Sequence, residues 1–331
     1  MSGEQTDAAA LYAGIREEIG RVVVGNEEAI EGLTIATLIR GHVLLEGVPG
    51  IAKTTIASCF ARVTGLEHSR IQMTPDLLPA DITGTNVYRE ETGEFVLHRG
   101  PIFANVVVAD EINRATSKTQ SALLEAMAER TVTIGGETLS LPEPFLVIAT
   151  QNPIEMEGVF ELPEAQRDRF RLKITIELPA RENERAMLDR FDADPVLGPD
   201  QIEQTVDPSD LIAAREAVAG VHVAEPVKEY ILDLVAATRA HSDVRHGGSP
   251  RASLSLLDAG KARAAIRGRE YAIPDDIKGI AESVFVHRLV LDTEAELGGV
   301  TPGEIVEDVL GSVDVPNGET AVADAGTSLQ Q

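Results

Sequence analysis

The stretch E-G-V-P-G-I-A-K-T-T (Glu46–Thr55) decides how this chain is interpreted. An apolar run, Val43–Leu45, precedes it and predicts a strand, and a helical pattern begins at Lys53. A Gly/Pro-rich turn between a strand and a helix is typical of a phosphate-binding loop, in which backbone N–H groups and the positive end of the helix face phosphate oxygens. Lys53 would reach the β- and γ-phosphates of a nucleotide, and the Thr54 hydroxyl would hold Mg²⁺.

At one position this loop departs from the general pattern G-x-x-x-x-G-K-[ST]. Ala52 occupies the place of the second glycine. The alternative interpretation of the stretch is an ordinary Gly/Pro turn beside an ordinary lysine. The sequence that follows has to decide between the two.

A second motif supports the phosphate-binding loop. The apolar run Val106–Ala109, of the kind that lies inside a parallel sheet, ends in Asp110 and Glu111. Asp110 would belong to the Mg²⁺ shell. Glu111 would polarise the attacking water, which loses a proton as it approaches the γ-phosphorus. An apolar strand that ends in Asp-Glu after such a loop favours a nucleotide-hydrolysis site over a chance turn.

A third polar residue follows another buried strand. The run Phe145–Thr150 ends in Q-N-P, which places Asn152 where it would hold the lytic water or the γ-phosphate. A plain turn-former before Pro153 is the alternative. Strands and helices alternate through this region, which predicts a doubly wound parallel sheet with the site at the carboxyl ends of its strands.

Two hairpins interrupt this alternation. The runs Asn86–Arg89 and Glu94–His98 flank an E-E-T-G turn, and T-V-T-I-G-G-E-T-L-S-L contains two alternating strands about Gly135-Gly136. From Arg181 to Arg288 the patterns are mainly helical. We therefore expect an all-α second domain after the α/β core.

The expected organisation has four parts. They are an N-terminal helical segment (1–24), a nucleotide-binding α/β core (25–179), a helical second domain (180–290) and a tail (291–331). No Lys or Arg follows Arg288, and the last residues are acidic and rich in small side chains. That composition predicts a disordered tail.

The charge balance is strongly acidic, with 54 Asp and Glu against 29 Lys and Arg and a net charge of −25. So acidic a surface disfavours broad contacts with nucleic acid or anionic lipid. An acid excess along the whole chain is also typical of a salt-rich cytoplasm, because 1 M salt screens charges within about 3 Å. In a halophilic protein the acidity would reflect the habitat and say less about partners.

Other classes of protein are disfavoured by what the sequence lacks. A single cysteine, Cys59, excludes an internal disulfide and is expected in the core, and the seven histidines have no metal-ligand spacing. The N-terminus has no apolar segment of a secretory signal, and no uncharged apolar run approaches the roughly 18 residues of a membrane span. We expect a cytoplasmic protein.

On these motifs the chain resembles the AAA+ ATPases and, within them, the MoxR family, over roughly residues 20–290. The more specific shared segments are G-V-P-G-I-A-K-T, R-I-Q-M-T-P-D-L-L-P-A-D-I-T-G, D-E-I-N-R-A, A-T-Q-N-P, L-P-E-A-Q-R-D-R-F and S-P-R-A. An alanine before the lysine is a feature of this family, so Ala52 favours the assignment. The resemblance implies an α/β fold, the P-loop AAA+ doubly wound parallel sheet with hairpin insertions, plus an all-α lid domain. It implies ATP and Mg²⁺ as cofactors.

The resemblance also assigns roles to residues. Asn152 resembles the first sensor, Arg251 in S-P-R-A resembles the second sensor, and Arg169 in D-R-F resembles the arginine finger that completes a neighbouring subunit's site. The family usually has an apolar residue before D-R-F, where this chain has Arg167, so Arg167 is the alternative finger. A surface salt bridge is the alternative role for either arginine. Nucleotide contacts are expected from Val24 and Gly25, which resemble the adenine-lining segment, and from the loop residues Gly47, Val48, Pro49, Gly50, Ile51, Ala52, Lys53, Thr54 and Thr55.

The function implied is that of an ATP-hydrolysing ring, expected to be a homo-hexamer, that remodels or matures client proteins in a chaperone-like way, cofactor insertion included. A partner with a von Willebrand A domain would be a separate chain, since the motif D-x-S-x-S is absent here. Two alternatives stay open: a chelatase-type or nucleic-acid-translocating motor, and a nucleotide-gated scaffold without turnover. The hairpin tips R-E-E-T-G-E and I-G-G-E-T are acidic or neutral, which disfavours pulling on nucleic acid.

Overall fold

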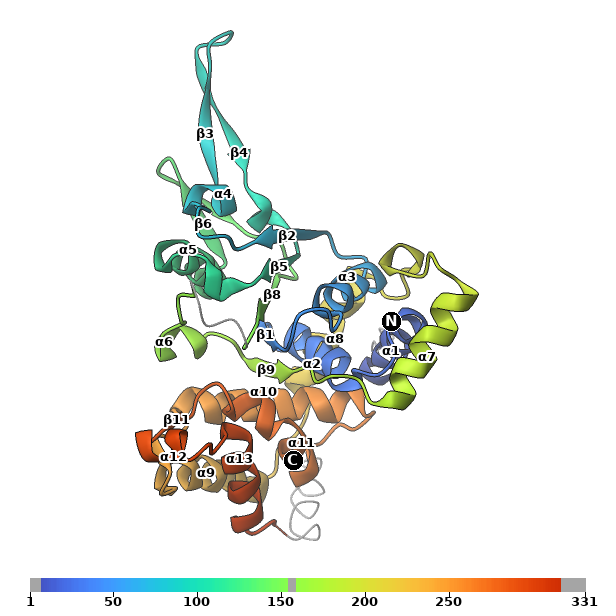
Figure 1. Ribbon diagram of the computed structural model, residues 1–331, viewed down its shortest axis with the longest axis vertical. Coiled ribbons are helices and arrows are strands. Elements are labelled where there is room, and N and C mark those ends of the chain that lie inside the picture. The colour runs from blue at the N-terminus through green and yellow to red at the C-terminus, as the bar shows by residue number, and fades with distance from the viewer. Residues whose placement is uncertain (1–6, 154–158, 317–331) are drawn as a thin grey trace, which may run out of the picture. The chain divides into compact units, whose positions relative to one another are not determined.

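The computed structural model (Figure 1) describes residues 7–153 and 159–316. The chain divides into two compact units. An α/β unit contains Ala13–Phe170 and Ile174–Leu211, and a helical unit contains Arg171–Lys173, the segment from Ile212 onward and the first residues up to Tyr12.

A five-stranded sheet forms the centre of the α/β unit, with the strand order β2-β5-β8-β1-β9. The pairs β2/β5, β5/β8 and β8/β1 are parallel. The strands are β1 (Val43–Glu46), β2 (His68–Gln72), β5 (Val106–Asp110), β8 (Leu146–Gln151) and β9 (Leu172–Thr175). The chain leaves β1 for one edge, returns strand by strand to β8, and continues to β9 on the other side of β1. This order confirms the predicted doubly wound sheet and puts the reversal at β1, where such folds bind ligands.

The helices before, between and after these strands are short to medium in length. They are α1 (Ala8–Val22), α2 (Glu27–Leu38), α3 (Lys53–Val63), α4 (Pro79–Thr83), α5 (Ser117–Glu129), α6 (Glu164–Arg167) and α7 (Arg181–Ala193), with single 3₁₀ turns η1 (Pro101–Phe103), η2 (Ile112–Arg114) and η3 (Pro199–Gln201). Helix α1 runs across the division at Tyr12/Ala13, and α8 (Pro208–Gly220) runs across it at Leu211/Ile212.

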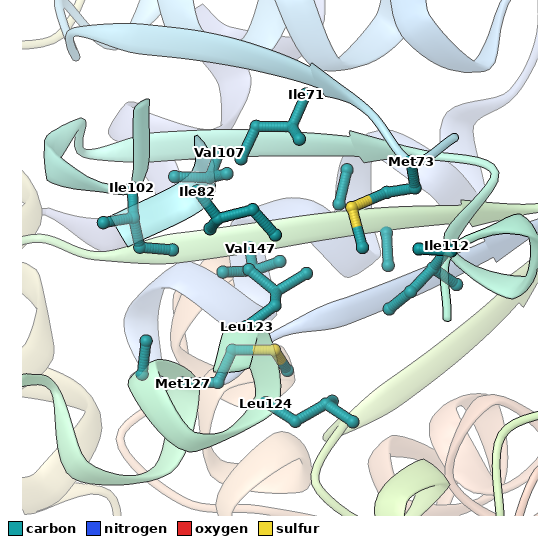
Figure 2. Close-up of a cluster of buried hydrophobic side chains, with 14 of the residues drawn as sticks. Ile71, Met73, Ile82, Ile102, Val107, Ile112, Leu123, Leu124, Met127 and Val147 are labelled. Carbon is teal, nitrogen blue, oxygen red and sulfur yellow. The ribbon is translucent and has the colours of Figure 1, made fainter. Parts of the chain in front are cut away.

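One apolar cluster joins the sheet to α4 and α5 (Figure 2). Val107 and Val147 of the central strands contribute to it, together with Ile82 of α4 and Leu123 and Met127 of α5. Each apolar side chain of this size contributes about 1.5–3 kcal/mol when it is fully buried. All five residues of β5 are buried, as expected of a parallel strand covered on both faces. The cluster therefore fixes the strand that ends in Asp110.

Both predicted hairpins are present. In the first, β3 (Gly84–Arg89) pairs antiparallel with β4 (Glu94–Arg99), and Figure 1 shows this ribbon projecting from the α/β unit. In the second, β6 (Thr131–Ile134) pairs with β7 (Glu137–Ser140). Its turn residues Gly135 and Gly136 have φ of 60° and 90°, the left-handed values that a two-residue hairpin turn requires.

Besides the part of α8 from Ile212 onward, the described part of the helical unit contains four longer helices, one short helix and two short antiparallel strands. They are α9 (Glu225–Ala240), α10 (Pro250–Ile266), α11 (Pro274–Phe285) and α13 (Pro302–Ser312), with α12 (Thr293–Leu297), β10 (Val244–His246) and β11 (Val290–Leu291). The helical domain expected after the α/β core is confirmed, and the structure adds the short β10/β11 pair, which an all-α domain would lack.

The structure differs from the expected disordered tail at residues 293–312, which form α12 and α13. Helix α13 begins with a capping box, in which the Thr301 hydroxyl accepts from the Glu304 N–H (3.3 Å) and the Glu304 carboxylate accepts from the Thr301 N–H (2.8 Å). Ile305, Val306 and Val309 are buried on one face. The expectation rested on the acidic composition of the whole segment, in which a few apolar residues at helical spacing have little weight. The expectation for residues 317–331 lies outside the described residues.

Candidate nucleotide-hydrolysis site

The phosphate loop joins β1 to α3, and its backbone explains the alanine in the motif. Gly50 has a φ of 84°, and Ala52 has φ 66° and ψ 20°. Ala52 therefore adopts the left-handed conformation that glycine usually supplies, at a cost of about 1–3 kcal/mol for a residue with a Cβ. Helix α3 begins at Lys53, so the free N–H groups of its first turn lie directly after the loop. The conformation required of an anion-binding loop is thus formed without the second glycine.

The Lys53 ammonium group lies against the same loop. Its Nζ donates to the carbonyl oxygens of Gly47 and Val48 (3.2 Å to Val48) and to that of Gln151 at the end of β8 (3.4 Å). A Cβ on Gly47 would overlap the backbone oxygen of Ile176, so only glycine fits there. The loop's one positive charge is therefore held between the loop and the strand that leads to Asn152.

Asp110 links the loop to β5. Its carboxylate accepts from the Thr54 hydroxyl (3.2 and 3.3 Å), from the Thr150 hydroxyl (3.2 Å) and from Arg70 Nε (2.6 Å). The Asp110 side chain is only 6% exposed, against 60% for Arg70. A threonine hydroxyl and a carboxylate that meet at one point are oxygen ligands of the kind that Mg²⁺ takes together with substrate phosphates. The residues therefore fit the predicted ion.

This fit does not extend to a cage made by the protein alone. In the described segments no group of three or more His, Cys, Asp or Glu side chains could hold a metal ion. Thr54 and Asp110 would accordingly supply only part of a coordination shell, which is usual for Mg²⁺ at phosphate sites.

Glu111 follows β5 in a left-handed conformation, with φ 57° and ψ 54°. Its N–H donates to the Thr150 hydroxyl (2.9 Å), and its carboxylate accepts from Gln72 Nε2 (2.9 Å) and pairs with Arg114 (3.4 Å). Such backbone geometry persists in a non-glycine residue only where its surroundings fix it. The carboxylate itself is partly exposed, so water can reach it.

Sequence reasoning missed Arg70 and Gln72, which both lie on β2. The register pairs Gln72 with Asp110 and Arg70 with Val108, and residues two apart on a strand share a face. Arg70 therefore contacts Asp110, which ends β5, and Gln72 contacts Glu111, which follows it. The available signal was the alternation R-I-Q in a strand that ends at the same sheet edge.

Asn152 lies directly after β8 and is 5% exposed. Because β8 lies between β5 and β1 and is parallel to both, its end is at the same edge as the phosphate loop and Asp110. The structure thus brings together the ends of the strands that carry the predicted loop, acidic pair and sensor.

The two candidate finger residues lie near α6. Arg169 is exposed and donates through Nη1 to the Leu124 carbonyl of α5 (2.5 Å). Arg167 ends α6, and its buried Nε has no hydrogen-bond partner among the described residues.

The remaining predicted contacts lie in separate places. Val24 and Gly25 lie between α1 and α2, and Gly25 has a φ of 73° and faces Asn183 so closely that a Cβ would come within 2.9 Å of its side-chain nitrogen. Arg251 lies in the helical unit, in the first turn of α10, and its N–H donates to the Ser249 hydroxyl (3.2 Å).

Cys59 is fully buried on α3, and this burial raises the pKa of its thiol to about 12. The expected core role is confirmed. No helix within residues 7–153 and 159–316 is long and apolar enough to cross a membrane.

Comparison with known proteins agrees with this geometry. The model of the ATPase family associated with various cellular activities (AAA) matches residues 42–172, and that of the AAA lid domain matches residues 236–309. Chaperone MoxR1 of Mycobacterium tuberculosis is 45% identical over 321 residues, which cover 94% of this chain and 84% of the relative. Protein MoxR of Methylorubrum extorquens is 32% identical over 338 residues, with 95% of each chain covered.

A solved structure gives the same result. A crystal structure of a protein described as an ATPase, from Cytophaga hutchinsonii, has a TM-score of 0.87 and 39% identity, with 96% of this chain and 98% of that chain covered. The phosphate loop and the Asp-Glu pair lie within the first matched region, and α10, α11 and α12 of the helical unit lie within the second. The chain therefore belongs to the MoxR family of AAA+ ATPases, enzymes that hydrolyse ATP.

Proposed function

We propose that this ATPase remodels or matures protein complexes in a chaperone-like way, with cofactor insertion among its tasks, and that it works as a homo-oligomeric ring, expected to be a hexamer. Support comes from the relative described as Chaperone MoxR1 and from the relative described as Protein MoxR. The observation that supports the ATP-driven step of the proposal is the hydrogen-bonded chain Thr54–Asp110–Thr150–Glu111, which joins the phosphate loop to the residue that would act on water.

In this proposal each strand end has one task. Lys53 would bind the β- and γ-phosphates, Thr54 and Asp110 would hold Mg²⁺, and Glu111 would take the proton from the attacking water. Asn152, buried at the end of β8, orients that water or the γ-phosphate. Bound Mg²⁺ would neutralise charge on the phosphates.

The ring completes the site. Arg169 is exposed and its described contact is with the backbone of α5, so its charge is available to an adjacent subunit. Arg167 is the alternative finger. Arg251 of the helical unit is the proposed second sensor, and Val24 and Gly25 are the proposed adenine contacts.

Partners and setting follow the family. We propose a client protein and a separate von Willebrand A-domain protein as partners and a cytoplasmic location. The acidic or neutral hairpin tips and the net charge of −25 support a protein client over nucleic acid. The same acid excess supports a halophilic habitat, in which molar KCl would raise the melting temperature by screening repulsion.

The test is a refolding assay with a chemically denatured reporter enzyme at fixed salt. We expect wild-type chain with MgATP to raise the yield of active reporter, and the non-hydrolysable analogue AMP-PNP to raise it much less. Glu125→Gln, an exposed change on α5, is the matched control for Glu111→Gln and should behave as wild type. A scaffold without turnover would act equally with both nucleotides, and that result would contradict the proposal.

A further inference from the structure

The β3–β4 hairpin exposes a group of large apolar side chains. Tyr88 is 52% exposed and Phe95 70%, and Val87, on the opposite face of the ribbon, is 42% exposed. Single exposed apolar residues are ordinary, but neighbouring ones on a projecting element mark a site of interaction. Figure 1 shows that the ribbon projects from the rest of the α/β unit.

The aromatic residues form one ordered pair. The strand register places Tyr88 opposite Phe95, with ring centroids 5.3 Å apart and planes at 57°. The next pair on that face is Asn86 and Leu97. Leu97 packs against the core, and a Cβ on Gly135 would overlap the Asn86 side chain, so the second hairpin supports this end of the face. The face is thus fixed at its base and open at Tyr88 and Phe95.

The charge beside this pair restricts what can bind. Glu90, Glu91 and Glu94 surround the tip and are exposed, with Arg89 as the one basic residue among them. Nucleic acid and anionic membranes are repelled by such a tip, and a second copy of this chain is as acidic as the first. A polypeptide that carries Lys or Arg is attracted to it.

Backbone groups add to the argument. The hairpin is a sheet of two strands only, and within the described residues no third strand pairs with either edge. Such edges bind extended peptide segments by adding a strand, while pockets or rings beside the edge select side chains.

We propose that the β3–β4 hairpin binds extended segments of client proteins in which apolar side chains alternate with Lys or Arg, through the Tyr88/Phe95 pair and the glutamates of the tip. The inference rests on the proposed chaperone-like function and names the class of segment that it acts on.

The test measures the affinity of the full chain for short unstructured peptides by fluorescence anisotropy. Three probes are used: one alternates Leu and Arg, one alternates Leu and Glu, and one alternates Ser and Arg. We expect the Leu/Arg peptide to bind about tenfold or more tightly than either of the others, because it alone meets both the rings and the glutamates; tenfold corresponds to about 1.4 kcal/mol.

Variants assign this binding to the hairpin. The double change Tyr88→Ser with Phe95→Ser should weaken Leu/Arg binding about tenfold or more, as loss of aromatic anchors does. Changing Glu90, Glu91 and Glu94 to Gln should weaken it at low salt and little at high salt. Leu297→Ser, at an 85% exposed position of α12, is the matched control and should bind as wild type. Basal ATPase activity of all variants should equal that of wild type.

Several results would overturn the inference. Wild-type affinity in the double variant would show that the aromatic side chains do not bind peptide. Phe95→Ser alone is the milder variant, measured in case the double variant does not fold. Preference for phosphatidylglycerol vesicles or a DNA oligonucleotide would identify another class of partner, and altered sedimentation of the double variant would identify a second copy. If the wild-type chain neither binds peptide nor assists refolding, the proposed function is contradicted together with the inference. If the double variant assists refolding as well as wild type does, only the assignment of client binding to the hairpin is contradicted.

Discussion

At the carboxyl end of β5, the Asp110 side chain is 6% exposed and accepts hydrogen bonds from three residues, whereas Phe95 on the β3–β4 hairpin is 70% exposed and has one aromatic neighbour. The strand ends satisfy their polar groups inside the chain. The hairpin leaves its apolar groups in water. In the first region the chain's own contacts hold strained residues such as Glu111 in place.

The difference indicates where each region finds its binding partner. Removing a buried carboxylate leaves its hydrogen-bond donors unpaired, which costs free energy. Substitutions at the strand ends should therefore lower the rate of ATP hydrolysis by orders of magnitude. An exposed side chain makes few contacts within the chain. Substitutions there should therefore change the affinity for an external partner and leave folding and hydrolysis unchanged. The experiments below test that contrast, and the one on Arg169 tests the proposed ring, in which an exposed side chain would act at the strand ends of a neighbouring subunit.

The largest expected effect is at Arg169. An arginine finger contributes roughly 10³–10⁵ to the rate, so Arg169→Ala should bind ATP normally and be nearly inactive. Mixed with the Glu111→Gln chain, it should recover activity, because some interfaces then combine an intact Glu111 with a neighbour's intact Arg169. The measurement is ATPase rate against mixing ratio.

Arg185→Ala, an exposed change on α7, is the control and should be active alone. Zero activity at all ratios, with mixed rings verified by native mass spectrometry, would count against a finger that acts in trans from Arg169. Recovery with Arg167→Ala in its place would move the role to Arg167.

Glu111→Gln should lower the hydrolysis rate about 10²–10⁴-fold, since a positioned general base contributes that much. ATP affinity should be nearly unchanged, because the carboxylate acts on water. Lys53→Ala gives the opposite pattern, with weaker ATP binding in isothermal titration. Wild-type turnover in Glu111→Gln would show that another residue is the base.

Gln72→Leu should lower kcat about tenfold and leave the ATP dissociation constant and melting temperature unchanged, because Glu111 loses the hydrogen bond that orients it; small misplacements of a reacting group can cost up to about 10²-fold. Single-turnover kinetics would separate the chemical step from binding. A rise in basal rate would mean that Gln72 restrains Glu111, contrary to this prediction.

The sequence predicted the site residues that belong to recognisable motifs. It missed the residues that reach the site only through the order and register of the strands. Thr54 and Asp110 carry motif signatures, and they meet in the structure. Gln72 reaches Glu111 only because β2 is paired with β5 in one particular register, and a shift by one residue would turn its side chain to the other face. No local pattern determines that register.

The C-terminal helices were missed for a different reason. Composition averaged over residues 291–331 is acidic and lacks Lys and Arg, which predicts disorder. Helix α13 depends on a capping box at Thr301 and three buried apolar residues, a signal shorter than the averaging window. Hairpins and buried strands were predicted well because their turn glycines and apolar runs are local.

Thiol chemistry compares the two regions directly. Burial raises the pKa of Cys59 to about 12, so at pH 8 its thiol should react very slowly with Ellman's reagent. Thr92→Cys at the exposed hairpin tip supplies a matched thiol and should react at once. Fast reaction of Cys59 in the folded wild-type chain would contradict its burial.

The same shift gives a pH dependence. A folded pKa above the unfolded value of about 8.5 means that the neutral thiol stabilises the fold below that pH. This contribution should be lost as the pH rises from about 8.5 towards 12. The melting temperature should therefore fall more steeply in wild type than in Cys59→Ala over the alkaline range.

The smallest effect is expected at Phe95. Phe95→Ala removes a ring that is mostly in water, so the free energy of unfolding should change by no more than about 0.5 kcal/mol, as for ordinary surface substitutions. Leu123→Ala on α5 deletes a fully buried side chain of the central cluster and should cost about 2–5 kcal/mol. Urea denaturation at constant salt measures the free energy of unfolding of both variants.

Basal ATP hydrolysis should be unchanged in Phe95→Ala, since the described contact of its aromatic ring is with Tyr88 and not with the strand ends. If Phe95→Ala lowered the free energy of unfolding by several kcal/mol, the Phe95 side chain would have to be covered in solution by this chain or a second copy. The contrast between the two regions would then not hold.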